Sequence, residues 1–193
     1  MLAWIVGWRW TILGIAGEKL DFDALSQDGK IDYIVFNNYL QHELRQLDIQ
    51  SASFAEMAYL LPFAKTITGL EETRRRMEPL DPEKSAALLT AMNKQVDSVR
   101  KALEVTLKPE NKSAAVTKTV ANRASSAVNS FRNTLKHWFN YYNGYDPLFT
   151  WWVSAPYKAV DEALKSYGEF LKEKLAGIKP DDKTTIIGNP IGK

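Results

Sequence analysis

The chain has 193 residues, of which 45% are hydrophobic and 25% charged, as is typical of one soluble globular domain with a real core. Its formal net charge of +2 is too small to indicate nucleic acid or an anionic membrane as a partner. The chain contains no cysteine, which excludes disulfides, thiolate metal ligands and a cysteine nucleophile.

Residues 1–17 (MLAWIVGWRWTILGIAG) are the one stretch that could act as a targeting signal. Most are apolar, and Gly14 and Ala16 have the small side chains that a signal peptidase accepts. Against this, no Lys or Arg precedes the apolar run, and Arg9 interrupts it. The stretch is also too short and too interrupted to span a bilayer. We therefore expect a buried or interface helix, no membrane partner, and a cytoplasmic location slightly favoured over secretion.

Apolar residues recur at three-and-four spacing through most of the remaining chain, which predicts helices. The start and stop signals place these helices at residues 27–49, 82–107, 113–142 and 156–175. Asp81-Pro82 is a clean helix start, whereas Pro62 interrupts any helix that begins near Phe54. Ser154 and Pro156 are expected to open the last helix, and Gly177 lies just past its end. The sequence thus predicts an all-α, irregular bundle of long antiparallel helices.

Residues 138–157 (WFNYYNGYDPLFTWWVSAPY) are far richer in Trp, Tyr and Phe than the chain average of 11%. Asn-Gly and Asp-Pro dipeptides within this stretch predict a change of chain direction. The aromatic residues form either a core corner where helices meet, which we favour, or a substrate-cleft wall or docking face. The candidate cleft or interface residues are His137, Tyr141, Tyr145, Asp146, Trp151 and Trp152. Trp151 and Trp152 are neighbours and should differ in burial, with one of them or Tyr145 partly exposed at a concave patch.

The polar candidates have two interpretations each. Asp146 is either a partly desolvated acid among aromatic rings or, as we favour, a turn aspartate that bonds its own backbone ahead of Pro147. His137 either interacts with the helix C-terminal dipole or lines the aromatic corner. The run Arg74–Arg76 follows two glutamates on a helical pattern, which favours a solvated, partly paired face over a phosphate clamp.

The sequence offers no catalytic residue and no metal ligand set. His42-Glu43 begins like a zinc-protease motif, but that motif needs a second His four residues after the first, and position 46 is Gln46. No glycine-rich phosphate loop and no nucleophile elbow occur. A complete small enzyme is therefore the least favoured class of protein.

Four stretches resemble the amino-terminal half of the domain-of-unknown-function 885 family. They are LDFDALSQDGKIDYIVFNNYLQHELRQLD (20–48), FAEMAYLLPFAKTITGLEETRRRMEPLDPEK (54–84), FNYYNGYDPLFTWWVSAPY (139–157) and IIGNPIGK (186–193). The resemblance implies a largely helical protein similar to HExxH zinc metallopeptidases, without an established substrate. The family's zinc segment, a His-Glu followed by Gly-His-His, lies downstream of the IGNPIG stretch and does not occur in this chain. No cofactor is therefore expected here, and zinc is implied for the absent half alone.

The resemblance also predicts the organisation and partners of the chain. Residues 1–19 are an atypical start, 20–177 a helical domain of a larger fold, and 178–193 an irregular tail that leads to the absent carboxy-terminal half. The tail and the amino-terminal stretch should then pack poorly, and the chain should bind its missing half, another protein or a second copy. The implied function is a scaffold or substrate-side portion that is inactive alone. The alternative is a self-sufficient helical interaction module without catalytic activity.

Overall fold

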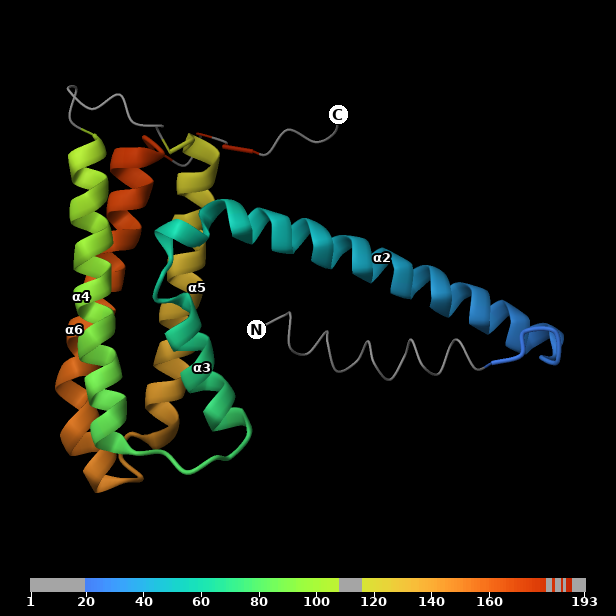
Figure 1. The fold of residues 1–193 in the computed structure, drawn as a ribbon, viewed down its shortest axis with the longest axis horizontal. Coiled ribbons are helices and arrows are strands. Elements are labelled where there is room, and N and C mark those ends of the chain that lie inside the picture. The colour runs from blue at the N-terminus through green and yellow to red at the C-terminus, as the bar shows by residue number, and fades with distance from the viewer. Residues whose placement is uncertain (1–19, 108–115, 180–181, 183–184, 186, 189–193) are drawn as a thin grey trace. The chain divides into compact units, whose positions relative to one another are not determined.

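The structure, a computed structural model, describes residues 20–107, 116–179, 182, 185, 187 and 188. These described residues form helices and no strand, which confirms the predicted all-α fold (Figure 1). The chain divides into two compact units, Met1–Glu56 and Met57–Lys193, and each is described by itself. The helix expected within residues 1–17 lies outside the described residues, and the domain limits expected at 20 and 177 stay predictions.

The helix α2, Gln27–Met57, lies in the first unit except for its last residue, and it starts where the sequence predicts. Ser26 precedes it, and its hydroxyl oxygen accepts a hydrogen bond from the Gly29 amide at 3.2 Å, as a helix cap does. The predicted end at residue 49 is wrong, because the helix continues to Met57. No proline or glycine lies between these positions, and the first proline of the chain is Pro62, so the local chemistry does not end the helix earlier.

α2 buries none of its residues, although many of them are apolar. Phe22, in the turn before the helix, packs on Tyr33 with ring centroids 5.3 Å apart. The exposed large apolar residues of α2 are Ile31, Ile34, Val35, Phe36, Tyr39, Ile49 and Phe54. Ile31, Ile34 and Val35 are spaced three and four residues apart and so share one face, and an apolar helix face normally packs against a neighbour. The expected self-association therefore stays a prediction, and this surface supports it.

The second unit begins with the short helix η1, Ala58–Leu60, and the helix α3, Ala64–Arg75. α3 was not among the predicted helices. Pro62 separates η1 from α3, as the sequence predicts, because its ring lacks an N–H and restricts the preceding residue. Leu61 and Phe63 flank this proline and are buried, so the interruption directs the chain into the core.

The helices α4, Pro82–Thr106, and α5, Lys118–Tyr142, confirm two further predictions. The Asp81 carboxylate caps α4 by accepting a hydrogen bond from the amide three residues later, at 3.1 Å. α5 ends where predicted but starts later than residue 113. Its start is fixed by Thr117, whose hydroxyl oxygen accepts a hydrogen bond from the Val120 amide at 3.3 Å.

The last long helix is α6, Pro147–Phe170, and its predicted start near Pro156 is wrong. Asp146 caps the helix and Pro147 occupies its first position, where the missing N–H costs nothing. Pro156 therefore lies inside the helix and removes one backbone hydrogen bond there. Val153 and Val160, before and after Pro156, are both fully buried on the core side. This packing holds the helix together through the proline.

After α6 the chain continues as η2, Leu171–Leu175, so the predicted end of the last helix is confirmed. Gly177 follows with φ 76°, a left-handed conformation that favours glycine. Ile178 is buried against Ala121 of α5, and Ile187 packs on the same small cluster. The expectation that the tail packs poorly is therefore wrong for these two described residues.

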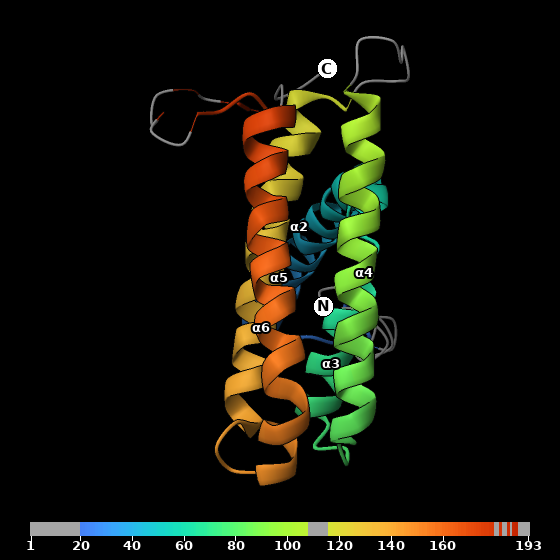
Figure 2. The ribbon, with the colours of Figure 1, turned by 90° about the vertical axis from the view of Figure 1, so that its left-hand side faces the viewer.

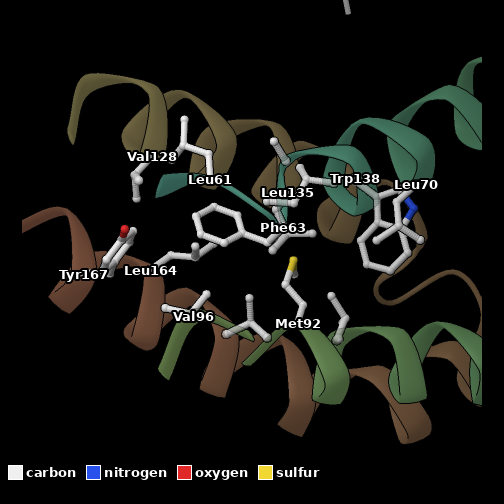
Figure 3. Close-up of a cluster of buried hydrophobic side chains, with 14 of the residues drawn as sticks. Leu61, Phe63, Leu70, Met92, Val96, Val128, Leu135, Trp138, Leu164 and Tyr167 are labelled. Atoms are coloured by element: carbon white, nitrogen blue, oxygen red, sulfur yellow. The ribbon is translucent and has the colours of Figure 1, made fainter. Parts of the chain in front are cut away.

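Three long helices form the body of the second unit. α4, α5 and α6 lie side by side, with α5 antiparallel to the other two, and α3 packs on α5 (Figures 1 and 2). Phe63 lies at the centre of the core (Figure 3), in edge contact with Phe131 at 6.5 Å and with Tyr167 at 6.1 Å between ring centroids. Other fully buried side chains are Leu60, Ile67, Leu89, Met92, Val96, Leu135, Trp138, Phe149, Leu164 and Leu171.

Polar contacts fix these helices against one another. Arg132 of α5 donates two hydrogen bonds to the Asp161 carboxylate of α6, both at 2.9 Å. The buried Tyr167 hydroxyl donates to the Leu60 carbonyl oxygen at 2.8 Å and so ties α6 to η1. Both contacts join residues far apart in sequence, so they fix the relative positions of the helices in the second unit.

Candidate functional site

The aromatic stretch of residues 138–157 divides into a buried and an exposed set. The buried set includes Trp138, Phe139, Phe149 and Val153, whereas Tyr141, Tyr145, Leu148, Trp151 and Trp152 are exposed. The helix period causes this division, because residues 149 and 153 share one face of α6 and residues 148, 151 and 152 share another. The core corner and the exposed surface predicted as alternatives thus coexist in one segment.

The buried rings join α5 firmly to α6. The Trp138 ring centroid lies 5.3 Å from that of Phe149 and 6.0 Å from that of Tyr142, both in edge-to-face geometry. Phe139 stacks on Tyr157 with centroids 3.9 Å apart and an interplanar angle of 2°. Such aromatic pairs contribute about 0.5–1.5 kcal/mol each beyond the area they bury. The corner is therefore a rigid base for the turn between the two helices.

Asp146 stabilises that turn. Its Oδ1 atom accepts hydrogen bonds from the amides of Leu148 at 2.9 Å and Phe149 at 3.3 Å. Gly144, with φ 84°, supplies the left-handed residue of the turn, and its amide donates to the Thr150 hydroxyl at 3.1 Å. The interpretation of Asp146 as a turn aspartate is thus confirmed, and its position among the rings reflects helix capping.

Four exposed side chains follow this turn and its helix start: Tyr145, Leu148, Trp151 and Trp152, here called the aromatic end. Their exposed fractions are 90%, 65%, 79% and 43% in the same order. Trp151 and Trp152 differ in burial and stay exposed, as the sequence predicts. Leu148 was missed, because its spacing of three and four residues from the tryptophans becomes a signal only once α6 is known to start at Pro147. The concave patch expected at these residues, and the alternative of a substrate cleft, stay predictions.

Tyr141 belongs to a different contact, between α3 and α5. The Arg74 guanidinium lies over its ring, with Cζ 5.1 Å from the centroid, which is a cation–π geometry. Arg74 is held in turn by Glu71, to which Nε and a terminal nitrogen donate at 2.9 and 2.6 Å. Tyr141 also meets the Tyr142 ring edge-to-face at 4.9 Å. A continuous set of contacts therefore leads from α3 to the corner beneath the aromatic end.

Glu71 is buried, with an exposed fraction of 4%, and it serves two arginines. Arg75 Nε donates to the same carboxylate at 3.0 Å. The hydrogen bond from Arg74 is the largest cause that lowers the pKa of Glu71, and burial opposes it. Arg76 pairs separately with Glu72. The expected partly paired face is confirmed, but the burial of Glu71 was missed, because a three-residue basic run does not reveal which neighbour faces the core.

The two histidines belong to different units, and each is described by itself. His137 is exposed on α5, four residues before Tyr141 and on the same helix face, whereas His42 is exposed on α2 in the other unit. Across the described ranges, no group of three or more His, Cys, Asp or Glu side chains is placed to hold a metal ion. Among the helices described, none is both long and apolar enough to cross a membrane.

Comparison with known proteins gives no match: no family model, no curated protein and no solved structure matches this chain. The resemblance to the domain-of-unknown-function 885 family therefore stays a prediction that the quoted sequence stretches carry.

Proposed function

We propose that this chain is a helical protein-binding unit that docks another polypeptide on its aromatic end. The observation that carries the proposal is the exposure of Tyr145, Trp151 and Trp152 in the same segment that packs Trp138 against Phe149. At about 150–250 Å² per aromatic side chain, their exposed fractions amount to roughly 300–500 Å². The largest apolar patch of a typical monomer, about 300–600 Å², is often functional, and Trp and Tyr are enriched among the residues that dominate binding energy.

The sequence resemblance suggests which polypeptide docks there. We propose the carboxy-terminal half of the family fold, which carries the His-Glu and Gly-His-His zinc segment, with this chain as its scaffold or substrate-side portion. The described residues of this chain do not offer a zinc ligand set. The resemblance implies zinc for that carboxy-terminal half alone, so we assign the zinc to the partner.

A second candidate is a self-sufficient helical interaction module, and one observation favours it. The second unit has a core in which Phe63, Trp138 and Tyr167 are fully buried, and side chains cap the starts of its three long helices, α4, α5 and α6. Such a core supports a unit that folds by itself. Both candidates use the aromatic end and differ in the partner alone.

The test mixes the full chain with a separate polypeptide that carries the zinc segment and measures their association by light scattering and calorimetry. We expect a complex of the two chains, weakened about thirtyfold by Trp151→Ser, because a central hot-spot residue contributes about 2 kcal/mol. Leu88→Ser, at an exposed leucine of α4, is the matched control and should leave the affinity unchanged.

Two other outcomes decide between the candidates. Absence of a complex with the zinc-segment polypeptide would exclude the first candidate and leave the independent module. A complex that tolerates both Trp151→Ser and Trp152→Ser would show that the aromatic end is not the docking surface, whichever partner is used.

A further inference from the structure

We propose that the arginine pair Arg74–Arg75 is a binding site for a carboxylate of an acidic peptide segment. The pair closes the last turn of α3, and Arg74 lies over Tyr141 near the end of α5. This inference goes beyond the proposed function, because it needs neither the aromatic end nor a zinc-bearing partner. It rests on how one buried carboxylate is shared between two guanidinium groups.

The two arginines of the pair differ in the number of hydrogen bonds that they donate to Glu71. Arg74 donates twice to Glu71, through Nε and a terminal nitrogen, and is the more buried of the two side chains. Arg75 donates to Glu71 through Nε alone, and its side chain is 48% exposed. An arginine has five N–H donors, so the four on the terminal nitrogens of Arg75 make no hydrogen bond within the described residues.

The number of positive charges in the pair also exceeds the number of negative charges that it contacts. Two guanidinium groups share the single Glu71 carboxylate, which leaves one positive charge in excess. The C-terminal end of α3 offsets about half a charge of this excess through the helix dipole. The neighbouring Arg76 pairs with both Glu72 and Glu78, so the three arginines and three glutamates together carry no net charge, and the positive excess is confined to the Arg74–Arg75 side of the cluster. The excess therefore lies at Arg75, where the unused donors also lie.

The Arg75 guanidinium is held in one orientation by Glu71, without any ligand. Glu71 is buried and fixes the Nε edge of Arg75, so the opposite edge, with its terminal N–H groups, stays available. A planar carboxylate accepts two parallel hydrogen bonds from such an edge. The exposed ring of Tyr141 and the exposed side chain of Met77 lie next to the pair in space and in sequence, respectively. They suit an apolar residue beside the carboxylate, which points to a peptide rather than a free ion.

The test uses the full chain and a labelled, doubly capped peptide of alternating glutamate and leucine, with fluorescence anisotropy as the measurement. The matched peptide has glutamine in place of glutamate. We expect the glutamate peptide to bind about tenfold more tightly than the glutamine peptide, since hydrogen bonds to charged groups contribute about 1.5–3 kcal/mol before screening by solvent. Higher salt should reduce the difference.

Three variants make the assignment specific. Arg75→Gln should abolish the preference for glutamate, Arg75→Lys should keep part of it, and Arg76→Gln should reduce it less than Arg75→Gln does, because it removes a nearby charge and none of the Arg75 donors. Thermal unfolding of each variant shows that it is folded. Equal binding of the two peptides to the wild-type chain would overturn the proposal, and so would an equal loss of preference in the Arg75→Gln and Arg76→Gln variants.

Discussion

Replacing Tyr167 by Phe removes one buried hydroxyl and keeps the ring that packs on Phe63. The hydroxyl donates to the Leu60 carbonyl oxygen at 2.8 Å, and both residues are fully buried. The variant leaves that carbonyl without its partner, and an unmatched buried polar group costs about 1–3 kcal/mol. We expect the free energy of unfolding to fall by about 2 kcal/mol. For a chain of this size the Tm should fall by about 4–8 °C.

The assay is thermal and urea unfolding of the full chain, followed by circular dichroism, with Tyr59→Phe as the matched control. Tyr59 is 58% exposed, so its hydroxyl keeps water as a partner and its loss should change stability by less than about 0.5 kcal/mol. Equal effects of the two substitutions would refute the reasoning, because the predicted cost depends on burial of the hydrogen bond and not on the hydroxyl itself.

Burial raises the pKa of Tyr167, so the folded state keeps the phenol proton longer than the unfolded state does. The contribution of the Tyr167 hydroxyl to the free energy of unfolding should be complete below about pH 10 and should fall as the pH rises beyond that value. Urea midpoints measured at several pH values should fall less steeply for the Tyr167→Phe variant than for the wild-type chain. Glu71→Gln removes a carboxylate whose pKa is lowered by Arg74; its contribution to wild-type stability is fully present above about pH 4.3 and is lost as pH falls toward the lowered pKa, so the variant should be less stable by about 1–2 kcal/mol at neutral pH and should lack this acid dependence. A double-mutant cycle with Arg132→Gln and Asp161→Asn should give a coupling of about 0.5–1 kcal/mol, and a coupling of zero would show that this pair does not hold α5 to α6.

The helices were predictable where local chemistry alone decides them. The start of α4 follows from Asp81 and Pro82, and the end of α5 follows from the turn residues after it. The start of α6 was predicted near Pro156, because a proline often occupies the first position of a helix, and this prediction was wrong. Tertiary packing of Val153 and Val160 overrides that preference, and a single sequence does not show which face is packed.

The candidate site was predictable in part for a similar reason. The aromatic composition of residues 138–157 indicated both a core and a surface, and helix spacing separates them once the start of α6 is known. With a helix assumed to begin at Pro156, residues 148, 151 and 152 had no common face, so Leu148 was missed. Glu71 was missed because its burial depends on contact between α3 and α5, which lie far apart in sequence.

The buried aromatic residues of this segment stabilise the fold, whereas the exposed ones are available to bind a partner. Phe149 and Val153 already supply the packing that holds α6, since both are fully buried. Trp151 and Trp152 add little to that core, and exposed substitutions away from caps and ion pairs usually change stability by less than about 0.5 kcal/mol. An exposed tryptophan adds apolar surface that favours association without strengthening the fold. Loss of partner binding at unchanged Tm in the Trp151→Ser variant would therefore identify a binding role, because a core residue of this size would lower both.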